Sequence, residues 1–124
     1  MNAILNRKSL LLLSLLTFSG LLKAETWPPK VPFSYALGMA QYVELCSSCH
    51  GKWGDGSDQG PPLMHVFYKR SHHSNASFHR AIMNGVKAHH WNFGDMPPIA
   101  GATEGDVKSI VRFVRWLQDK KGIK

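Results

Sequence analysis

The sequence predicts an all-α domain of three to five short helices joined by long loops. Apolar residues recur at helical spacing in three segments, about residues 34–46, 74–85 and 103–121. Beyond residue 24 no segment shows the alternation of a strand, and no internal repeat stands out. The loops 51–63 and 86–102 are rich in Gly and Pro. Loops of this length are uncommon in a packed domain, which indicates that they surround something.

The first 24 residues have the three-part layout of a secretory signal peptide. Two basic residues are followed by the uncharged run Ser9–Leu22, and Ala24 offers a small residue at the cut. The run of 14 residues is shorter than the roughly 20 that a membrane-spanning helix needs. We therefore expect residues 1–24 to be removed on export to a bacterial periplasm and residues 25–124 to form one domain. An uncleaved anchor is the alternative.

The first expected helix covers about residues 34–46, after a Pro-rich, extended segment. Ser34 can cap its start. The residues at helical spacing are Tyr35, Met39, Tyr42, Val43 and Cys46. Gly38 lies inside the helix, where Gly costs up to roughly 1 kcal/mol relative to Ala. Its presence indicates close approach of another helix.

Both cysteines of the chain lie in the pentapeptide Cys46-Ser47-Ser48-Cys49-His50. This C-x-x-C-H pattern is typical of covalent haem attachment, because two thiols add to the two vinyl groups of one porphyrin edge and the next residue reaches the iron. A redox-active CxxC would need a strand before it, and a zinc site would need further ligands at matching spacing. The sequence favours neither. We expect one haem c, attached through Cys46 and Cys49, with His50 as an iron ligand.

A second helix is expected around residues 74–85, beyond the loop 51–63. Ser74 or Ser77 can cap it, and Gly85 is a natural stop. One apolar face is formed by Phe78, Ala81 and Ile82.

The loop 86–102 contains the residue that we expect to be the second axial ligand of the iron. Two of the four methionines after residue 24 lie on expected helix faces, and Met64 remains an alternative. Met96 precedes two prolines, whose fixed φ angles can hold a weak thioether ligand in place. Methionine opposite histidine raises the haem potential. It also fills both axial positions, which favours electron transfer over catalysis.

The last helix has the clearest pattern. Thr103 and Asp106 resemble a capping box in which Asp replaces the usual Glu. The apolar stripe consists of Val107, Ile110, Val111, Val114 and Leu117. The residues expected on the solvent face are Lys108, Arg112, Arg115 and Gln118.

The expected mature domain is modestly basic. Twelve of the 15 Lys and Arg residues and all 8 Asp and Glu residues follow residue 24, a net charge of +4 with the histidines neutral. Such a charge favours acidic protein partners or anionic surfaces. The basic residues are scattered, so nucleic-acid binding is not indicated.

Together these motifs resemble the small soluble class I cytochromes c over about residues 34–118. In that family a Gly lies eight residues before the first Cys and an aromatic residue four before it, which correspond to Gly38 and Tyr42. Phe113 matches the aromatic residue of the C-terminal helix that lies over the Gly. The resemblance implies the cytochrome c fold, in which helices and long loops wrap around one covalently bound haem.

The resemblance also implies roles for residues after the C-x-x-C-H motif. The family's Gly-Pro-x-Leu element matches Gly60-Pro61-Pro62-Leu63. The Pro61 carbonyl would then accept a hydrogen bond from the His50 ring, and Leu63 would line the haem. The family's Met-Pro-Pro matches the segment that begins at Met96, which makes Met96 the ligand opposite His50.

Two segments depart from the family's pattern. His89 and His90 lie a few residues before Met96 and could displace its sulfur at high pH. Residues 66–70 have no clear counterpart. The candidate partners of the haem propionates are Tyr68, Arg70 and Trp91. We interpret the six histidines other than His50 as solvated loop residues, with adventitious copper or zinc binding as the alternative.

The leading hypothesis is a soluble monohaem electron carrier rather than an enzyme. It would exchange single electrons with redox proteins whose acidic docking surfaces meet Lys52 and Lys87. The first alternative is a haem-bearing electron-transfer subunit of a larger periplasmic oxidoreductase complex, with Trp27 and Trp53 at the interface. The second is a ligand-binding haem sensor. We expect no stable membrane insertion once the leader is cleaved, and a monomer or a subunit of a complex.

Overall fold

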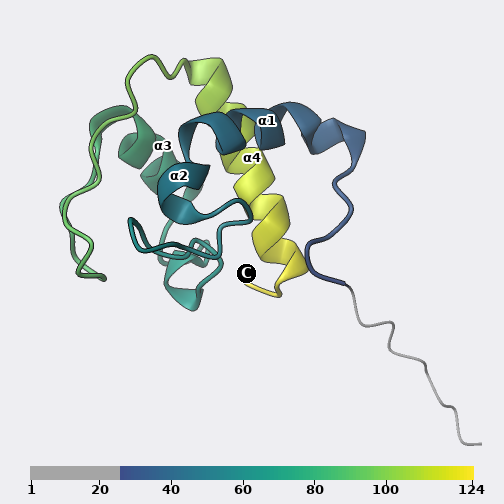
Figure 1. Cartoon of the computed structure of the whole chain (residues 1–124), viewed down its shortest axis with the longest axis horizontal. Helices are drawn as coiled ribbons and strands as arrows, with labels where there is room; N and C mark the ends of the chain where they lie inside the picture. The colour runs from purple at the N-terminus through teal and green to yellow at the C-terminus, as the bar shows by residue number, and fades with distance from the viewer. Residues whose placement is uncertain (1–25) are drawn as a thin grey trace, which may run out of the picture.

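The computed structural model describes residues 26–124. The expected leader, residues 1–24, lies outside the described residues, so its cleavage stays a prediction. The elements follow in the order η1 (Phe33–Tyr35), α1 (Ala36–Leu45), α2 (Ser47–His50), η2 (Val66–Tyr68), α3 (Asn75–Asn84) and α4 (Glu104–Lys120) (Figure 1). Residues 26–124 contain no strand, only an isolated antiparallel bridge. The predicted all-α architecture is confirmed.

The core of the fold is the crossing of α1 with α4 (Figure 1). A Cβ atom at Gly38 would collide with the Ser109 carbonyl oxygen and would lie 2.9 Å from the Cβ of Phe113. The rings of Tyr42 and Phe113, both buried, lie 5.6 Å apart between centroids. Gly38 therefore marks the close approach of a second helix, as predicted, and Phe113 lies beside it.

The start of α4 is fixed by the predicted capping box. The Thr103 N–H donates to Asp106 Oδ2 at 2.9 Å, and the Asp106 N–H donates to Thr103 Oγ1 at 3.2 Å. Hydrogen bonds from Thr103 hold the pKa of Asp106 below its usual value. The predicted apolar stripe is buried along its length: Val107, Ile110, Val111, Val114 and Leu117.

The prediction of which residues of α4 face the solvent is partly wrong. Lys108 and Arg112 are exposed as predicted. Arg115 is only 4% exposed and Gln118 is 0% exposed. The reason is that the segment 63–75 packs over this side of α4 and supplies backbone acceptors to both side chains.

Each of the two long loops follows a helix: the loop 51–63 follows α2, and the loop 86–102 follows α3. The expected first helix changes direction at Cys46, where φ is −125°, and α2 adds one further turn to His50. Ser74 caps α3 by accepting from the Ser77 N–H at 3.3 Å. Gly85 ends α3 with a φ of +77°, and a Cβ there would lie 3.0 Å from the Pro98 ring. Only Gly suits this turn, which leads the chain directly into the Met96 loop.

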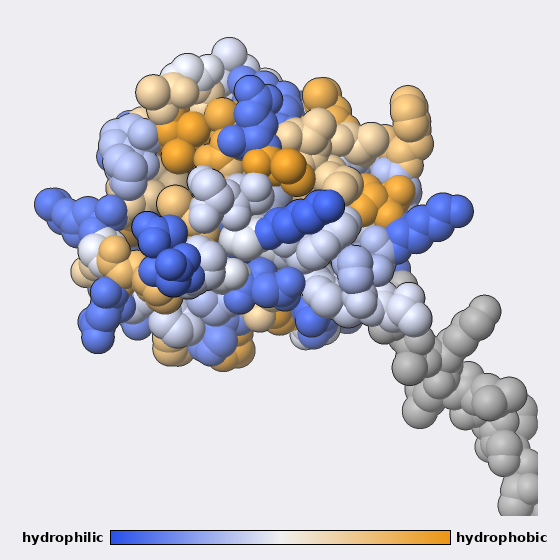
Figure 2. Space-filling view, in the orientation of Figure 1, coloured by the Kyte–Doolittle hydropathy of each residue, from blue (hydrophilic) through white to orange (hydrophobic). Residues whose placement is uncertain are grey.

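The surface over η1 and α1 exposes large apolar side chains. Phe33 is 96% exposed and Leu37 is 64% exposed. Figure 2 shows apolar residues gathered over the upper part of this face, where α1 lies, and mostly hydrophilic residues below them. No helix within residues 26–124 has both the length and the apolar character required to cross a membrane.

The close approach at Gly38 leads to the first prediction. Gly38→Ala should destabilise the protein by about 1–3 kcal/mol, because the added methyl group meets a backbone carbonyl that no side-chain rotation can move. Gly105→Ala is the matched control within a helix, since a Cβ there meets only Thr103 Oγ1 at 3.6 Å. The control should be as stable as the parent or more so. Urea unfolding followed by circular dichroism measures both, and equal midpoints for the two variants would contradict the close contact.

Candidate cofactor-binding site

A cavity of about 620 Å³ opens between the helices and the two long loops. Its size falls within the roughly 300–1,000 Å³ that is typical of cofactor pockets. The lining is predominantly apolar and draws on α1, α2, α3, α4 and the loops after α2 and α3. Five of the six predicted site residues line it: Cys46, His50, Pro61, Leu63 and Met96. The sixth, Cys49, is exposed beside it.

A single helical turn brings Cys46 and His50 to the same wall of the cavity. The His50 N–H donates to the Cys46 carbonyl at 3.0 Å, and both side chains face the lining. Both cysteines are free thiols. Burial raises the pKa of Cys46 to about 11. A redox-active CxxC needs a lowered thiol pKa, so this environment argues against the thioredoxin-like alternative.

The imidazole of His50 is held by a backbone acceptor. Its Nδ1 lies 2.9 Å from the Pro61 carbonyl oxygen. A carbonyl can only accept, so Nδ1 carries the proton and Nε2 keeps its lone pair. His50 is 9% exposed; burial lowers its pKa, and the hydrogen bond to Pro61 acts in the opposite direction. This is the hydrogen bond that the resemblance implies, and it leaves a neutral imidazole able to bind a metal.

A glycine allows the loop 51–63 to approach α2 closely. A Cβ at Gly60 would lie 2.9 Å from the Cys49 carbonyl oxygen. The Tyr42 hydroxyl donates to the Gly51 carbonyl at 2.8 Å. These contacts place the Pro61 carbonyl within hydrogen-bonding distance of His50 Nδ1.

The backbone of Met96 is fixed against the end of α3. Val86 and Met96 exchange two hydrogen bonds, N–H to carbonyl, of 2.8 and 2.9 Å, and the Ile99 N–H donates to the Ile82 carbonyl at 2.9 Å. The Met96 side chain lines the cavity from the loop that faces α2. The predicted restraint was the fixed φ angles of the two prolines that follow Met96, and the hydrogen bonds to Val86 are a further restraint that was not predicted.

The other described methionines lie away from the cavity lining. Met39 and Met83 pack against the core. The Met64 side chain packs on Gly54, where a Cβ would lie 2.8 Å from the Met64 Cε. Among residues 26–124, Met96 is thus the methionine whose side chain lines the cavity, and the geometry does not favour the Met64 alternative.

Two polar side chains line the cavity beside the loop after η2. The Trp91 Nε1 atom is buried without a hydrogen-bond partner. The Tyr68 hydroxyl is close to it: burial raises the pKa of Tyr68, and the Trp91 indole opposes part of that rise. Buried donors of this kind suit an anionic group inside the cavity. Arg70 does not join them, because its guanidinium pairs with Asp119 at 2.7 and 3.1 Å.

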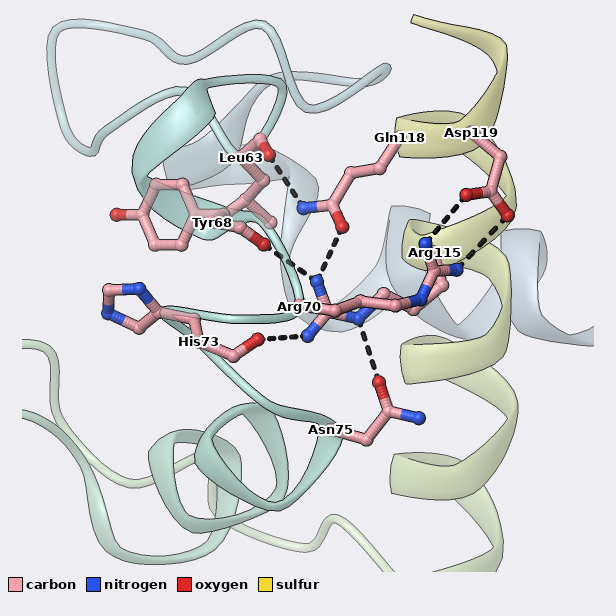
Figure 3. Close-up of polar contacts among 8 residues, drawn as sticks. All are labelled: Leu63, Tyr68, Arg70, His73, Asn75, Arg115, Gln118 and Asp119. Carbon is pink, nitrogen blue, oxygen red and sulfur yellow. Dashed lines mark hydrogen bonds and ion pairs between the residues drawn. The ribbon is translucent and has the colours of Figure 1, made fainter. Parts of the chain in front are cut away.

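Sequence reasoning missed the buried network that positions the segment 63–75 (Figure 3). The Arg115 guanidinium donates to the Asn75 side chain at 2.8 Å, the Tyr68 carbonyl at 2.7 Å, the Gln118 side chain at 2.6 Å and the His73 carbonyl. Gln118 in turn donates to the Leu63 carbonyl at 2.9 Å. The α4 helix thereby holds the backbone of Leu63, Tyr68 and His73, all of which line the cavity.

The loop histidines are exposed or half-buried, in agreement with their interpretation as solvated residues, but four of them lie together. Those that line the cavity besides His50 are His72, His73, His89 and His90. Burial lowers the pKa of His73 and of His90, and neighbouring imidazoles lower both further. The spacing along the chain gave no signal that the two pairs would meet.

The two lysines expected near the cofactor differ in position. Lys87 lines the cavity, and its ammonium group lies 2.5 Å from Asp95 Oδ2. Lys52 is exposed and lies over the Trp53 ring, 5.7 Å from its centroid. Lys52 therefore keeps a free positive charge, whereas Asp95 offsets that of Lys87.

The donor set and the cavity fit a haem. Two thiols lie one helical turn apart, a neutral imidazole nitrogen and a thioether line one apolar cavity, and a buried indole N–H lies in its wall. A sequence model of the family described as Cytochrome c matches residues 35–118, from the end of η1 into the last turn of α4. No curated protein and no solved structure matched the chain.

The buried network leads to the second prediction. Arg115→Met should destabilise the protein by about 3 kcal/mol or more, because the carbonyl oxygens of Tyr68 and His73 and the Asn75 side chain lose their donor. Arg70→Met is the matched control: it removes an ion pair that is nearly half exposed and should cost less than about 1 kcal/mol. Urea unfolding measures the free energy of unfolding of both variants. Comparable decreases would show that the buried network contributes no more to stability than the exposed ion pair does.

Proposed function

Because the chain belongs to the cytochrome c family, we propose that it is a monohaem electron carrier of the class I type. In this proposal one haem c is attached through Cys46 and Cys49, and His50 and Met96 are the axial ligands. Haem-based electron transfer is the family's function. The observation that carries the finer assignment is that His50 and Met96 line one cavity, together with the single C-x-x-C-H motif of the chain.

The two proposed ligands would shift the potential of the iron in opposite directions. When bound, haem supplies a one-electron iron couple. The hydrogen bond to Pro61 orients the His50 ring and increases its basicity as a ligand. The Met96 thioether is a soft ligand that raises the potential relative to a second imidazole.

The restraints on both ligands support a carrier rather than a sensor. His50 is held by its helical turn and by Pro61, and the Met96 backbone is held by Val86 on the far side. Two axial positions that stay filled leave no place for oxygen or another small ligand. Fixed ligands also change little in position when the iron gains or loses one electron.

We propose redox proteins with acidic docking surfaces as the partners. The net charge of residues 25–124 is positive, and Lys52 offers a free ammonium group near the C-x-x-C-H turn. Export to a bacterial periplasm, with residues 1–24 removed and residues 25–124 as the single mature domain, fits covalent haem attachment, which takes place outside the bacterial cytoplasm.

The exposed apolar surface supports a second candidate, a haem-bearing subunit of a larger oxidoreductase complex. Phe33 on η1 and Leu37 on α1 are both largely exposed. Trp27 does not contribute to such a surface, because its indole is hydrogen-bonded to Asp55 and lies under the Lys121 ammonium, 3.8 Å from the ring centroid. Gel filtration of native extract separates the two candidates, since a free carrier elutes at its monomer mass.

The axial assignment leads to the third prediction. In protein produced with haem-attachment machinery, Met96→Ala should abolish the sulfur-to-iron charge-transfer band of the oxidised spectrum and lower the reduction potential. Met64→Ala, which changes a methionine outside the lining, should leave both unchanged.

The absorption spectrum and a potentiometric titration of the two variants measure these effects. A band that persists in Met96→Ala and disappears in Met64→Ala would move the ligand to Met64. A parent protein without the band would have an open or bis-histidine iron, and the sensor hypothesis would then replace the carrier.

A further inference from the structure

Four histidines from two loops meet in the wall of the cavity, and the proposed electron transfer uses none of them. His72 and His73 precede α3, whereas His89 and His90 belong to the loop that carries Met96. The Nε2 atoms of His72 and His90 lie 3.2 Å apart. One ring nitrogen from each of His72, His73 and His90 lies within 4.8 Å of the others.

We propose that His72, His73 and His90 form a binding site for a divalent metal ion such as Cu²⁺, Ni²⁺ or Zn²⁺. Imidazole nitrogen suits Cu²⁺, Ni²⁺ and Zn²⁺, whereas Ca²⁺ and Mg²⁺ require oxygen ligands, which this group lacks. Three histidines are also a sufficient protein ligand set for zinc when water takes the fourth position.

The spacing of the nitrogen atoms agrees with a shared metal ion. Two ligand atoms about 2.0–2.1 Å from a tetrahedral zinc ion lie roughly 3.3 Å from one another. The separation of 3.2 Å between His72 and His90 is already close to that value. The third nitrogen, from His73, lies within 4.8 Å of the other two.

Backbone acceptors fix which nitrogen of two rings is free. His73 Nδ1 lies 2.6 Å from the Phe67 carbonyl, and His89 Nδ1 lies 2.8 Å from the Lys87 carbonyl. Since a carbonyl only accepts, both rings carry their proton on Nδ1 and offer Nε2. Histidine ligands of metals commonly show this hydrogen bond on their other nitrogen. His89 stacks on His73 with centroids 5.8 Å apart, so it lies beside the three-histidine group without belonging to it.

The positive charges near the group oppose the binding of a cation, so we expect only an ion with a high affinity for imidazole to bind there. The guanidinium of Arg80 and the ammonium of Lys87 also line the cavity, and Asp95 pairs with only the second of them. The bound ion must overcome this repulsion without help from a carboxylate ligand. Cu²⁺ should therefore bind most tightly, as expected from the general order of affinities among divalent metals.

A metal at this position would connect two segments that the backbone leaves separate. His72 and His73 lie on the segment that Arg115 holds against α4. His90 lies six residues before Met96. The metal would thus tie the Met96 loop to the anchored side of the cavity and restrain the movement of that loop.

Isothermal titration of the oxidised holoprotein with zinc chloride at pH 7.5 tests the proposal. The protein carries no polyhistidine tag, and Zn²⁺ is chosen because it exchanges no electrons with the haem. We expect one Zn²⁺ per chain, with an affinity at least tenfold weaker in His90→Gln and in His72→Gln. His79→Gln is the matched control, because His79 pairs with Glu104 on another side of the molecule. It should bind as the parent does.

The affinity should also fall at least tenfold between pH 7.5 and pH 5.5, because protons compete for the ring nitrogens. Binding that is absent in the parent, or unchanged in both His72→Gln and His90→Gln, overturns the metal site. The absorption spectrum recorded beside each titration keeps the proposals separate. An intact sulfur–iron band without saturable zinc binding overturns the metal site alone, and saturable binding without that band overturns the Met96 assignment alone.

Discussion

The contact between α1 and α4 at Gly38 is the constraint on which the rest of the structure depends. It lets the Ser109 carbonyl and Phe113 approach the α1 backbone more closely than any side chain would allow. Because α1 leads into the turn that ends at His50, this crossing also fixes where the C-x-x-C-H motif lies relative to α4. The adjacent face of α4 supplies Ile110 and Val114 to the cavity. One close helix crossing therefore sets the positions of two walls.

The remaining walls are loops, and each is held by a few polar contacts. Arg115 and Gln118 hold the segment 63–75 through its backbone carbonyls. Burying a guanidinium is costly unless its donors are satisfied, and here a ring contact with Phe78, 4.4 Å from the centroid, adds to the four acceptors. The Met96 loop has a lighter anchor, the pair of hydrogen bonds to Val86. The two sides of the cavity thus differ in how firmly they are fixed.

The sequence predicted those structural features that depend on residues close together in the chain. Helix periods, the capping box of Thr103 and the Gly stop at Gly85 are all local signals, and the structure has each of them. Gly38 was predictable because Gly inside a helix needs a reason. The Pro61 contact could be expected only from the resemblance, since it joins residues eleven apart through a loop.

The errors share one cause. Arg115 and Gln118 were placed in solvent because a helical period identifies the apolar stripe of α4 but not the segment that packs beside it. Arg70 was considered as a residue of the cavity, but it pairs with Asp119. Because Asp119 lies 49 residues away in the chain, the sequence did not indicate this ion pair. The contact between the two histidine pairs likewise depends on tertiary structure, so the sequence did not indicate it.

The proposed haem would complete a core that the chain alone supplies only in part. A domain of about 100 residues buries a limited apolar surface. Part of its apolar surface here faces the cavity instead of another side chain, as Phe78, Ile82 and Val114 do. Covalent attachment through Cys46 and Cys49 would keep the cofactor in place when the loops open. The more lightly anchored Met96 loop would then govern ligand exchange, and the histidine group joins that loop to the segment that Arg115 holds.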